Sequence, residues 1–321
     1  MPELILRLPT RQPPARGLGP VATDVRAGLY GPLEHLFQTG RAAEIAGLGG
    51  VLAPDDPGGE EPWTVAAGAL RHSRHLRVVA EFSPSFATPV YAAKVSATLQ
   101  RAAGGRLGWR VAVGGDPAAR AAQGDTVTGP DAFRRAAEFL TAAKGVWHQR
   151  PYTFEGDFYR VLDGGFGHPL AGHPFPTVYL SGTGEAELDL SAEHADVHLV
   201  RFGADLDAVR AALADRASAH GREVRLGVEL SLSVRQTGRD DGPPEGVTGH
   251  WDGFAGLGHT VPEGLVGTPD ELAAELDRLA GRGVDTFVVE ATPALPEAYR
   301  LGEHVLPALE ALAAREASGA R

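Results

Sequence analysis

A turn rich in glycine and hydroxyl groups is the clearest candidate for chemistry in this sequence. Ser181-Gly182-Thr183-Gly184 follows the apolar run Thr177–Leu180 and precedes the helical pattern Glu185–His194. Backbone N–H groups at a helix N-terminus, together with two hydroxyls, are suited to binding a phosphate. The same glycines would equally form a tight helix cap without a ligand, in which Glu185 and Glu187 complement the helix dipole.

A carboxylate and a hydroxyl on one strand are candidate catalytic groups. Glu229 and Ser231 are two residues apart within Arg225–Val234, so their side chains should point the same way. If they point inward, Glu229 would have a raised pKa or a cationic partner such as Arg110 or Arg201. A structural ion pair in the interior is the alternative interpretation.

Several other kinds of site are excluded or unsupported. The chain has no cysteine, which excludes disulfides, thiolate metal sites and a cysteine nucleophile. No histidine has a carboxylate at the H-E-x-x-H offset, so no metal site is expected. Gly-x-Ser-x-Gly does not occur, which argues against an α/β-hydrolase. Gly114-Gly115-Asp116 lacks the G-x-G-x-x-G spacing and a following helix start, so a dinucleotide site is not expected.

The elements that must position these groups alternate along the whole chain. Apolar runs predict strands at Glu3–Leu8, Gly50–Ala53, Leu76–Phe82, Gly108–Val113, Thr177–Leu180, Val197–Arg201, Arg225–Val234 and Thr286–Glu290. Periodic patterns predict helices at Leu33–Ala46, Pro62–His72, Pro89–Ala103, Asp131–Val146, Glu185–His194, Leu206–His220, Thr268–Arg282 and from Glu297 to about Ala317. Eight strands alternating with eight helices favour an α/β fold, a (β/α)8 barrel formed as one domain by residues 1–321, over an open doubly wound sheet.

Two stretches depart from the alternation. Tyr152–Val161 predicts a small hairpin, and the Gly-, Asp- and Pro-rich Gln236–Pro262 predicts a loop at the rim. In a barrel, the polar residues that follow the strands should line the site. These are Thr10, Arg11, Asp55, Asp56, Ser83, Ser85, Gly114, Gly115, Asp116, Ser181, Thr183, Arg201, Ser231, Ser233, Glu290 and Thr292.

Composition narrows the partners and the compartment. The chain is 43% hydrophobic and 22% charged, as expected for a globular protein, with a formal net charge of -11. That charge, without a dense basic cluster, argues against nucleic acid or an anionic membrane as partner. No signal peptide and no window of 18 apolar residues stands out, so we expect a cytoplasmic location and no membrane span.

Several segments resemble the luciferase-like flavin-dependent monooxygenases, most closely the alkanesulfonate monooxygenase branch. The similarity runs nearly end to end and is carried by Thr88–Pro117, Phe154–Val161, Val178–Val200, Leu265–Val289 and Pro293–Leu312. It implies a (β/α)8 barrel with a shortened insertion after strand seven. It also implies reduced FMN supplied by a separate flavin reductase, oxidation of a small organic molecule with oxygen, and a homodimer.

The resemblance assigns expected roles to individual residues. Ser181-Gly182-Thr183-Gly184 aligns with the phosphate-binding turn of the family, and Arg11 stands at the position of a histidine after the first strand. His259 lies next to Gly258, which aligns with an arginine of the family's mobile loop. We therefore expect His259 to be the acid–base group, with an exposed loop histidine as the alternative.

Other family positions are changed here. A loop cysteine is Gly59, an Arg-Leu-His run reads Glu229-Leu230-Ser231, a Tyr-Pro-His run reads Thr292-Pro293-Ala294, and a flavin-facing asparagine is Arg110. Because a partly dry pocket must pair a sulfonate with Arg or Lys, the charge reversal at Glu229 argues against a simple alkanesulfonate substrate. Candidate catalytic residues are thus His259, Glu229, Ser231 and Arg110. A non-catalytic flavin-binding barrel or partner subunit and a deazaflavin-dependent oxidoreductase remain alternatives.

Overall fold

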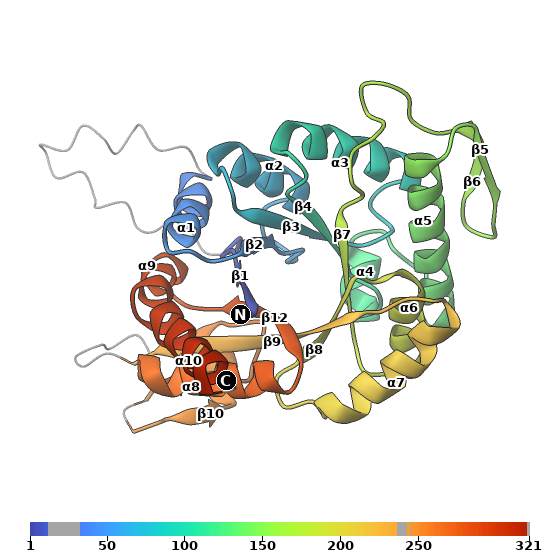
Figure 1. Cartoon of the computed structure of the whole chain (residues 1–321). Coiled ribbons are helices and arrows are strands. Elements are labelled where there is room, and N and C mark those ends of the chain that lie inside the picture. Colours follow the sequence, from blue (N-terminus) through green and yellow to red (C-terminus); the bar gives the residue numbers. More distant parts are fainter. Residues whose placement is uncertain (12–32, 236–242, 245, 320–321) are drawn as a thin grey trace, which may run out of the picture. The chain divides into compact units, whose positions relative to one another are not determined.

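Parallel strands alternating with helices give the chain the predicted fold class, a (β/α)8 barrel. The computed structural model describes residues 1–11, 33–235, 243–244 and 246–319 (Figure 1). The main sheet has the strand order β10-β11-β9-β12-β1-β2-β3-β4-β7-β8, with a further pairing of β9 with β8. The barrel strands are β1 (Glu3–Arg7), β2 (Gly50–Ala53), β3 (Arg77–Phe82), β4 (Leu107–Val111), β7 (Thr177–Ser181), β8 (Val197–Arg201), β9 (Arg225–Val234) and β12 (Val284–Glu290).

The chain forms two compact units, and the first is built around β1. It comprises residues 1–78, 201–203 and 228–321. Strand β1 pairs in parallel with β12 (Glu3 opposite Thr286) and with β2 (Ile5 opposite Gly50). The helices of this unit are α1 (Glu34–Ile45), α2 (Pro62–His72), α8 (Pro269–Gly281), α9 (Ala294–Arg300) and α10 (Leu306–Gly319), with a π-helical turn at Leu301–Val305.

Helix α8 shows how local sequence sets an element of this unit. Thr268 accepts from the Glu271 backbone N–H while the Glu271 carboxylate accepts from the Thr268 N–H, which is the predicted capping box. Leu272, Leu276 and Leu279 recur at helical spacing and are all buried. The cap therefore fixes where the helix begins, and the leucines fix which face packs inward.

The second unit comprises residues 79–200 and 204–227 and is built around β7. Strand β7 pairs in parallel with β4 (Val178 opposite Trp109) and with β8 (Tyr179 opposite Val197). Its longer helices are α3 (Pro89–Ala103), α5 (Pro130–His148), α6 (Glu185–His194) and α7 (Leu206–Ala219). The predicted hairpin is present as antiparallel β5 (Tyr152–Glu155) and β6 (Arg160–Gly164).

Aromatic rings fill the core of the second unit. The Trp109 ring lies 5.2 Å from Phe82 and 6.1 Å from Phe139, centroid to centroid. Its indole Nε1 donates a hydrogen bond of 2.7 Å to Ser96 Oγ of α3, which satisfies the one polar atom of the buried ring.

The structure corrects three expectations. A short helix, α4 (Pro117–Ala122), does begin after Gly114-Gly115-Asp116, because Asp116 accepts from the Ala118 N–H and Pro117 suits the first helical position. The predicted terminal helix begins earlier, at Ala294, and is interrupted by the π turn. Part of Gln236–Pro262 lies outside the described residues, and the rest is not simply a loop. It contains β10 (Gly249–Trp251) and a 3-10 helix (Gly253–Leu257).

A second strand, β11 (Gly264–Gly267), follows that region and pairs with β9 through a close backbone approach. A Cβ on Gly264 would lie 1.8 Å from the Ser231 carbonyl oxygen, so only glycine allows this pairing. Among the described residues, no helix is both long and apolar enough to cross a bilayer.

Candidate functional site

In the first unit, the carboxyl ends of β1, β2 and β12 bring charged side chains together. Arg7 Nη2 donates to Asp56 Oδ1 at 2.7 Å, and Thr10 Oγ1 donates to Asp56 Oδ2 at 3.1 Å. Arg11 is exposed, with its Nε 3.7 Å from Asp56 Oδ1. A cavity of about 40 Å³ lies among these residues and Glu290, which is room for roughly one or two water molecules.

His259 is held by a hydrogen-bonded chain that starts on β9. Ser231 Oγ lies 2.7 Å from His259 Nδ1 and 2.5 Å from the carbonyl oxygen of Val261. A carbonyl oxygen only accepts, so the single Ser231 hydroxyl proton goes to Val261, and Nδ1 must donate to Ser231 Oγ. The neutral imidazole then carries its lone pair on Nε2, with which the described residues form no hydrogen bond.

Burial keeps this imidazole neutral. His259 is 7% exposed, and burial lowers its pKa below 6.5, while the nearby Glu290 carboxylate acts in the opposite direction. The ring also packs against Phe254, 5.0 Å between centroids. His259 is therefore a buried, neutral imidazole rather than the exposed loop histidine of the alternative interpretation.

Glu290 fixes the segment that carries His259. Its carboxylate accepts from the Thr260 N–H at 3.0 Å, from Thr260 Oγ1 at 2.7 Å and from the Val261 N–H at 2.9 Å. The sequence placed Glu290 at the end of β12 but gave no sign of this role. The bonds join the end of β12 to the residues that follow the 3-10 helix, so the backbone beside His259 is anchored.

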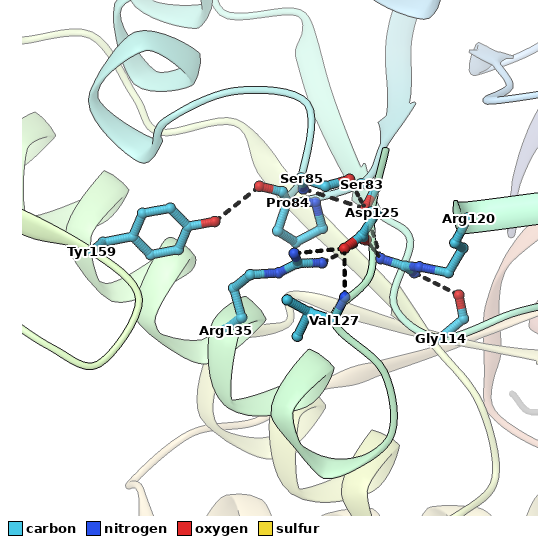
Figure 2. Close-up of polar contacts among 9 residues, drawn as sticks. All are labelled: Ser83, Pro84, Ser85, Gly114, Arg120, Asp125, Val127, Arg135 and Tyr159. Atoms are coloured by element: carbon cyan, nitrogen blue, oxygen red, sulfur yellow. Dashed lines mark hydrogen bonds and ion pairs between the residues drawn. The ribbon is translucent and has the colours of Figure 1, made fainter. Parts of the chain in front are cut away.

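In the second unit, a buried carboxylate bridges two arginines beside the ends of β3 and β4 (Figure 2). Arg135 donates to Asp125 through both terminal nitrogens, at 2.8 and 2.7 Å, and Arg120 pairs with the same carboxylate. The hydrogen bonds from Arg135 and Arg120 hold the pKa of Asp125 far below its ordinary value. The carboxylate therefore stays ionised and the cluster stays paired across the physiological range.

This cluster also fixes the loops that follow the two strands. Arg120 donates to the Gly114 carbonyl oxygen at 2.6 Å and to Ser83 Oγ at 3.1 Å. Ser85 and Ser83 share a hydrogen bond of 2.9 Å, and Tyr159 of the hairpin donates to the Pro84 carbonyl oxygen at 2.9 Å (Figure 2). Ser83, Ser85 and Gly114 were predicted to line the site. The ion-paired group Asp125, Arg120 and Arg135, here called the Asp125 clamp, holds them and has no recognisable sequence motif.

The remaining predicted catalytic residues lie in the interior. Arg110 Nε is 3.1 Å from Glu81 Oε1, and both side chains are 11% exposed, so the guanidinium is paired in a buried setting. Glu229 and Ser231 are 6% and 0% exposed.

The glycine turn Ser181-Gly182-Thr183-Gly184, the predicted phosphate site, leads directly into α6. Gly184 caps the helix without a side-chain hydrogen bond, and Gly182 has a φ of 135°, which favours glycine. His198 Nε2 donates to the Gly182 carbonyl oxygen at 2.8 Å, so its Nδ1 accepts from the Ser191 hydroxyl at the same distance. Burial lowers the pKa of His198, which favours this neutral, single-donor form.

A carboxylate competes for the same turn. Glu187 lies so close that a Cβ on Gly182 would be 2.2 Å from its Cγ, and one on Gly184 would be 2.4 Å from its Oε2. The half-buried Glu187 side chain therefore fills the space beside both glycines of the turn. Within the described ranges, no three His, Asp or Glu residues are arranged to hold a metal ion.

Comparison with known proteins identifies the family to which the chain belongs. The family model described as luciferase-like monooxygenase matches residues 4–240. A crystal structure of riboflavin lyase with modified FMN and riboflavin superposes with a TM-score of 0.75 at 18% identity, covering 98% of this chain and 92% of that one. EDTA monooxygenase from Chelativorans sp. BNC1 gives 0.73 at 18%, covering 97% and 93%. An F420-dependent secondary alcohol dehydrogenase gives 0.70 at 17%, covering 87% and 96%.

Proposed function

The chain belongs to the luciferase-like monooxygenase family, and we propose that it is the oxygenase of a two-component system that uses FMNH2 and oxygen. It is an oxidoreductase of the flavin-dependent monooxygenase type. The observation that carries the proposal is the buried, neutral His259, whose Nδ1 is fixed by Ser231 and whose Nε2 keeps its lone pair.

His259 supplies acid–base chemistry in this proposal. With Nδ1 donating to Ser231, Nε2 is the atom that takes a proton from the reacting group and returns it. The hydrogen bonds from Thr260 and Val261 to Glu290 anchor the backbone next to His259. They therefore limit movement of the imidazole and preserve the alignment that proton transfer requires. A group positioned in this way contributes roughly 10²–10⁴-fold to a reaction rate.

The phosphate of the cofactor would be held at the glycine turn before α6. Ser181, Thr183 and the first N–H groups of α6 would bind it once the Glu187 side chain rotates away. The exposed Arg11 would pair with an anionic group of the cofactor. Reduced flavin, when bound, supplies the electrons that activate oxygen. The protein's part is then to exclude water and to hold the proton at His259 Nε2.

The substrate is an organic molecule other than a simple alkanesulfonate. A sulfonate is a permanent anion and needs a cation that is not already neutralised. Arg110 is paired with Glu81, and Glu229 contributes a buried carboxyl group. A neutral or cationic substrate suits these side chains better. We further propose a separate flavin reductase as the electron source, a homodimer and a cytoplasmic location.

One experiment separates this proposal from two alternatives, a deazaflavin-dependent enzyme and a barrel that catalyses no reaction. The first alternative is supported by the similar fold of the F420-dependent dehydrogenase. The purified protein is titrated anaerobically with FMNH2, oxidised FMN and reduced F420, and oxygen is then admitted while absorbance is followed. Tight FMNH2 binding and an oxygen-dependent transient support the proposal. Preference for reduced F420 overturns it in favour of the deazaflavin enzyme, and binding of none of the three overturns both.

A further inference from the structure

The second unit contains a cavity remote from the strand ends described above. It has a volume of about 540 Å³, within the range of roughly 300–1,000 Å³ of small-molecule sites. It lies between the end of α5 and the segment that leads into β7, next to Pro174. Pro174 in turn meets Gly105, just before β4, so the cavity is at the amino ends of β4 and β7. The clamp in Figure 2 is at the opposite, carboxyl end of β4.

One wall of the cavity is aromatic and rigid. Phe166 is half-buried and lies edge-on to Trp147, with ring centroids 6.2 Å apart. Trp147 is 5% exposed, packs against Phe175 at 5.0 Å, and donates through Nε1 to the His173 carbonyl oxygen at 2.8 Å. These contacts fix the indole, and the indole in turn supports the Phe166 ring. A ligand that packs against this apolar wall would therefore lose little free energy to ordering of the side chains.

The rest of the lining carries hydrogen-bond donors and no carboxylate. Arg150, His148, His173 and the Gln149 amide all line the cavity, on a chain whose net charge is -11. No carboxylate of the described residues forms an ion pair with Arg150. A planar guanidinium with open donors pairs best with a planar carboxylate, through two parallel hydrogen bonds.

We propose that this cavity is a second binding site, for a planar aromatic carboxylate whose ring lies against Phe166 and whose carboxylate pairs with Arg150. The ring and the charge are both needed. The aromatic wall alone would accept any apolar molecule, and an exposed arginine alone binds anions weakly in water. The site is independent of the flavin chemistry proposed above, because it lies at the other end of β4.

The test is calorimetric titration of the protein of residues 1–321 with 2-naphthoate, 2-naphthamide and cyclohexanecarboxylate. We expect 2-naphthoate to bind at least tenfold more tightly than the uncharged amide and than the non-aromatic acid. Arg150→Gln should weaken 2-naphthoate binding at least tenfold, whereas Arg41→Gln, which removes an exposed arginine of α1, should not.

A blocking variant keeps the test independent of Arg150. Ala171 is exposed and lines the cavity, so Ala171→Trp should fill it and abolish binding while thermal unfolding is unchanged. Failure of 2-naphthoate to bind at millimolar concentration overturns the proposal. Equal binding of the three compounds overturns it, as does undiminished binding to either Arg150→Gln or Ala171→Trp.

Discussion

Ser231 accepts a hydrogen bond from His259 Nδ1, rather than donating one, although the two side chains form a pair that resembles a serine–histidine dyad. The reason is the carbonyl oxygen of Val261, 2.5 Å from Ser231 Oγ, which takes the only hydroxyl proton. Ser231 is therefore not activated as a nucleophile. It is a positioning residue that sets the tautomer of His259.

This assignment predicts a spectroscopic signature. Nitrogen-15 NMR of the wild type at neutral pH should show His259 with Nδ1 protonated and Nε2 unprotonated. Ser231→Ala removes the acceptor and should shift the ring toward a mixture of tautomers, with the protein still folded. An Nε2-protonated ring in the wild type would contradict the assignment, whatever the activity of the variant.

The close approach of Gly264 to β9 predicts a sharp steric effect. Gly264→Ala places a Cβ against the Ser231 carbonyl oxygen and should destabilise the protein by about 1–3 kcal/mol, because the backbone must move. Gly256→Ala is the matched control, since no atom beyond its own local backbone lies within 4 Å of its Cβ position. Chemical denaturation measures both, and equal stability of the two variants would exclude the proposed clash.

The position of Glu187 predicts that this carboxylate weakens anion binding at the glycine turn. Glu187→Gln removes a negative charge from the turn and should raise the affinity for FMNH2 by about two- to fivefold, equivalent to about 0.4–1 kcal/mol. Glu185→Gln makes the same charge change at an exposed side chain and should have the smaller effect. Anaerobic fluorescence titration compares the two. Identical affinities in both variants and the wild type would place the phosphate elsewhere.

The Asp125 clamp predicts a large loss of stability when it is opened. Asp125→Asn leaves the buried Arg135 and the half-buried Arg120 without their counter-charge and should cost about 3–5 kcal/mol in the free energy of unfolding. Asp131→Asn breaks an exposed pair with Arg134 and should have a much smaller effect. Urea denaturation of both variants is the measurement. A small effect of Asp125→Asn would mean that the two arginines are solvated.

The lowered pKa of His194 predicts that protonation of this residue contributes to the loss of folding stability at acid pH. Burial, with repulsion from Lys144 and Arg222, lowers the pKa of His194 to about 3. The unfolded chain protonates this histidine near pH 6.5, so its contribution to stability is intact above that pH and is lost as the pH falls toward 3. Between pH 7 and 5 the wild type should lose about 2 kcal/mol more than His194→Gln does. The exposed His168→Gln should follow the wild type, and parallel curves for all three proteins would refute the assignment.

Much of the fold could be predicted because its boundary signals are local. Helices α2, α3 and α6 begin and end where the sequence predicts. Proline stands at the first position of α2 and α3 and fits there without losing a hydrogen bond. Short strands such as β2 are continuous apolar runs, as sheets covered on both faces require. The single-domain organisation of residues 1–321 stays a prediction.

The site was harder to predict because its contacts join residues distant in the sequence. Ser231 and His259 were each candidates, but their hydrogen bond spans 28 positions and depends on the 3-10 helix and β11, which were not expected. Asp125 lies in a polar stretch between two helices, where nothing marks it as buried. Spacing arguments find residues on one strand or one helix face, and they do not find partners brought together by a loop.

The placement of the tryptophans gives the protein a built-in optical reporter. Of the four in the chain, Trp63 and Trp251 belong to the first compact unit, and Trp109 and Trp147 belong to the second. Replacing one pair with phenylalanine leaves emission from the other unit alone. Two such double variants would show whether the units melt in a single transition or in sequence, and so whether the chain behaves as one cooperative folding domain.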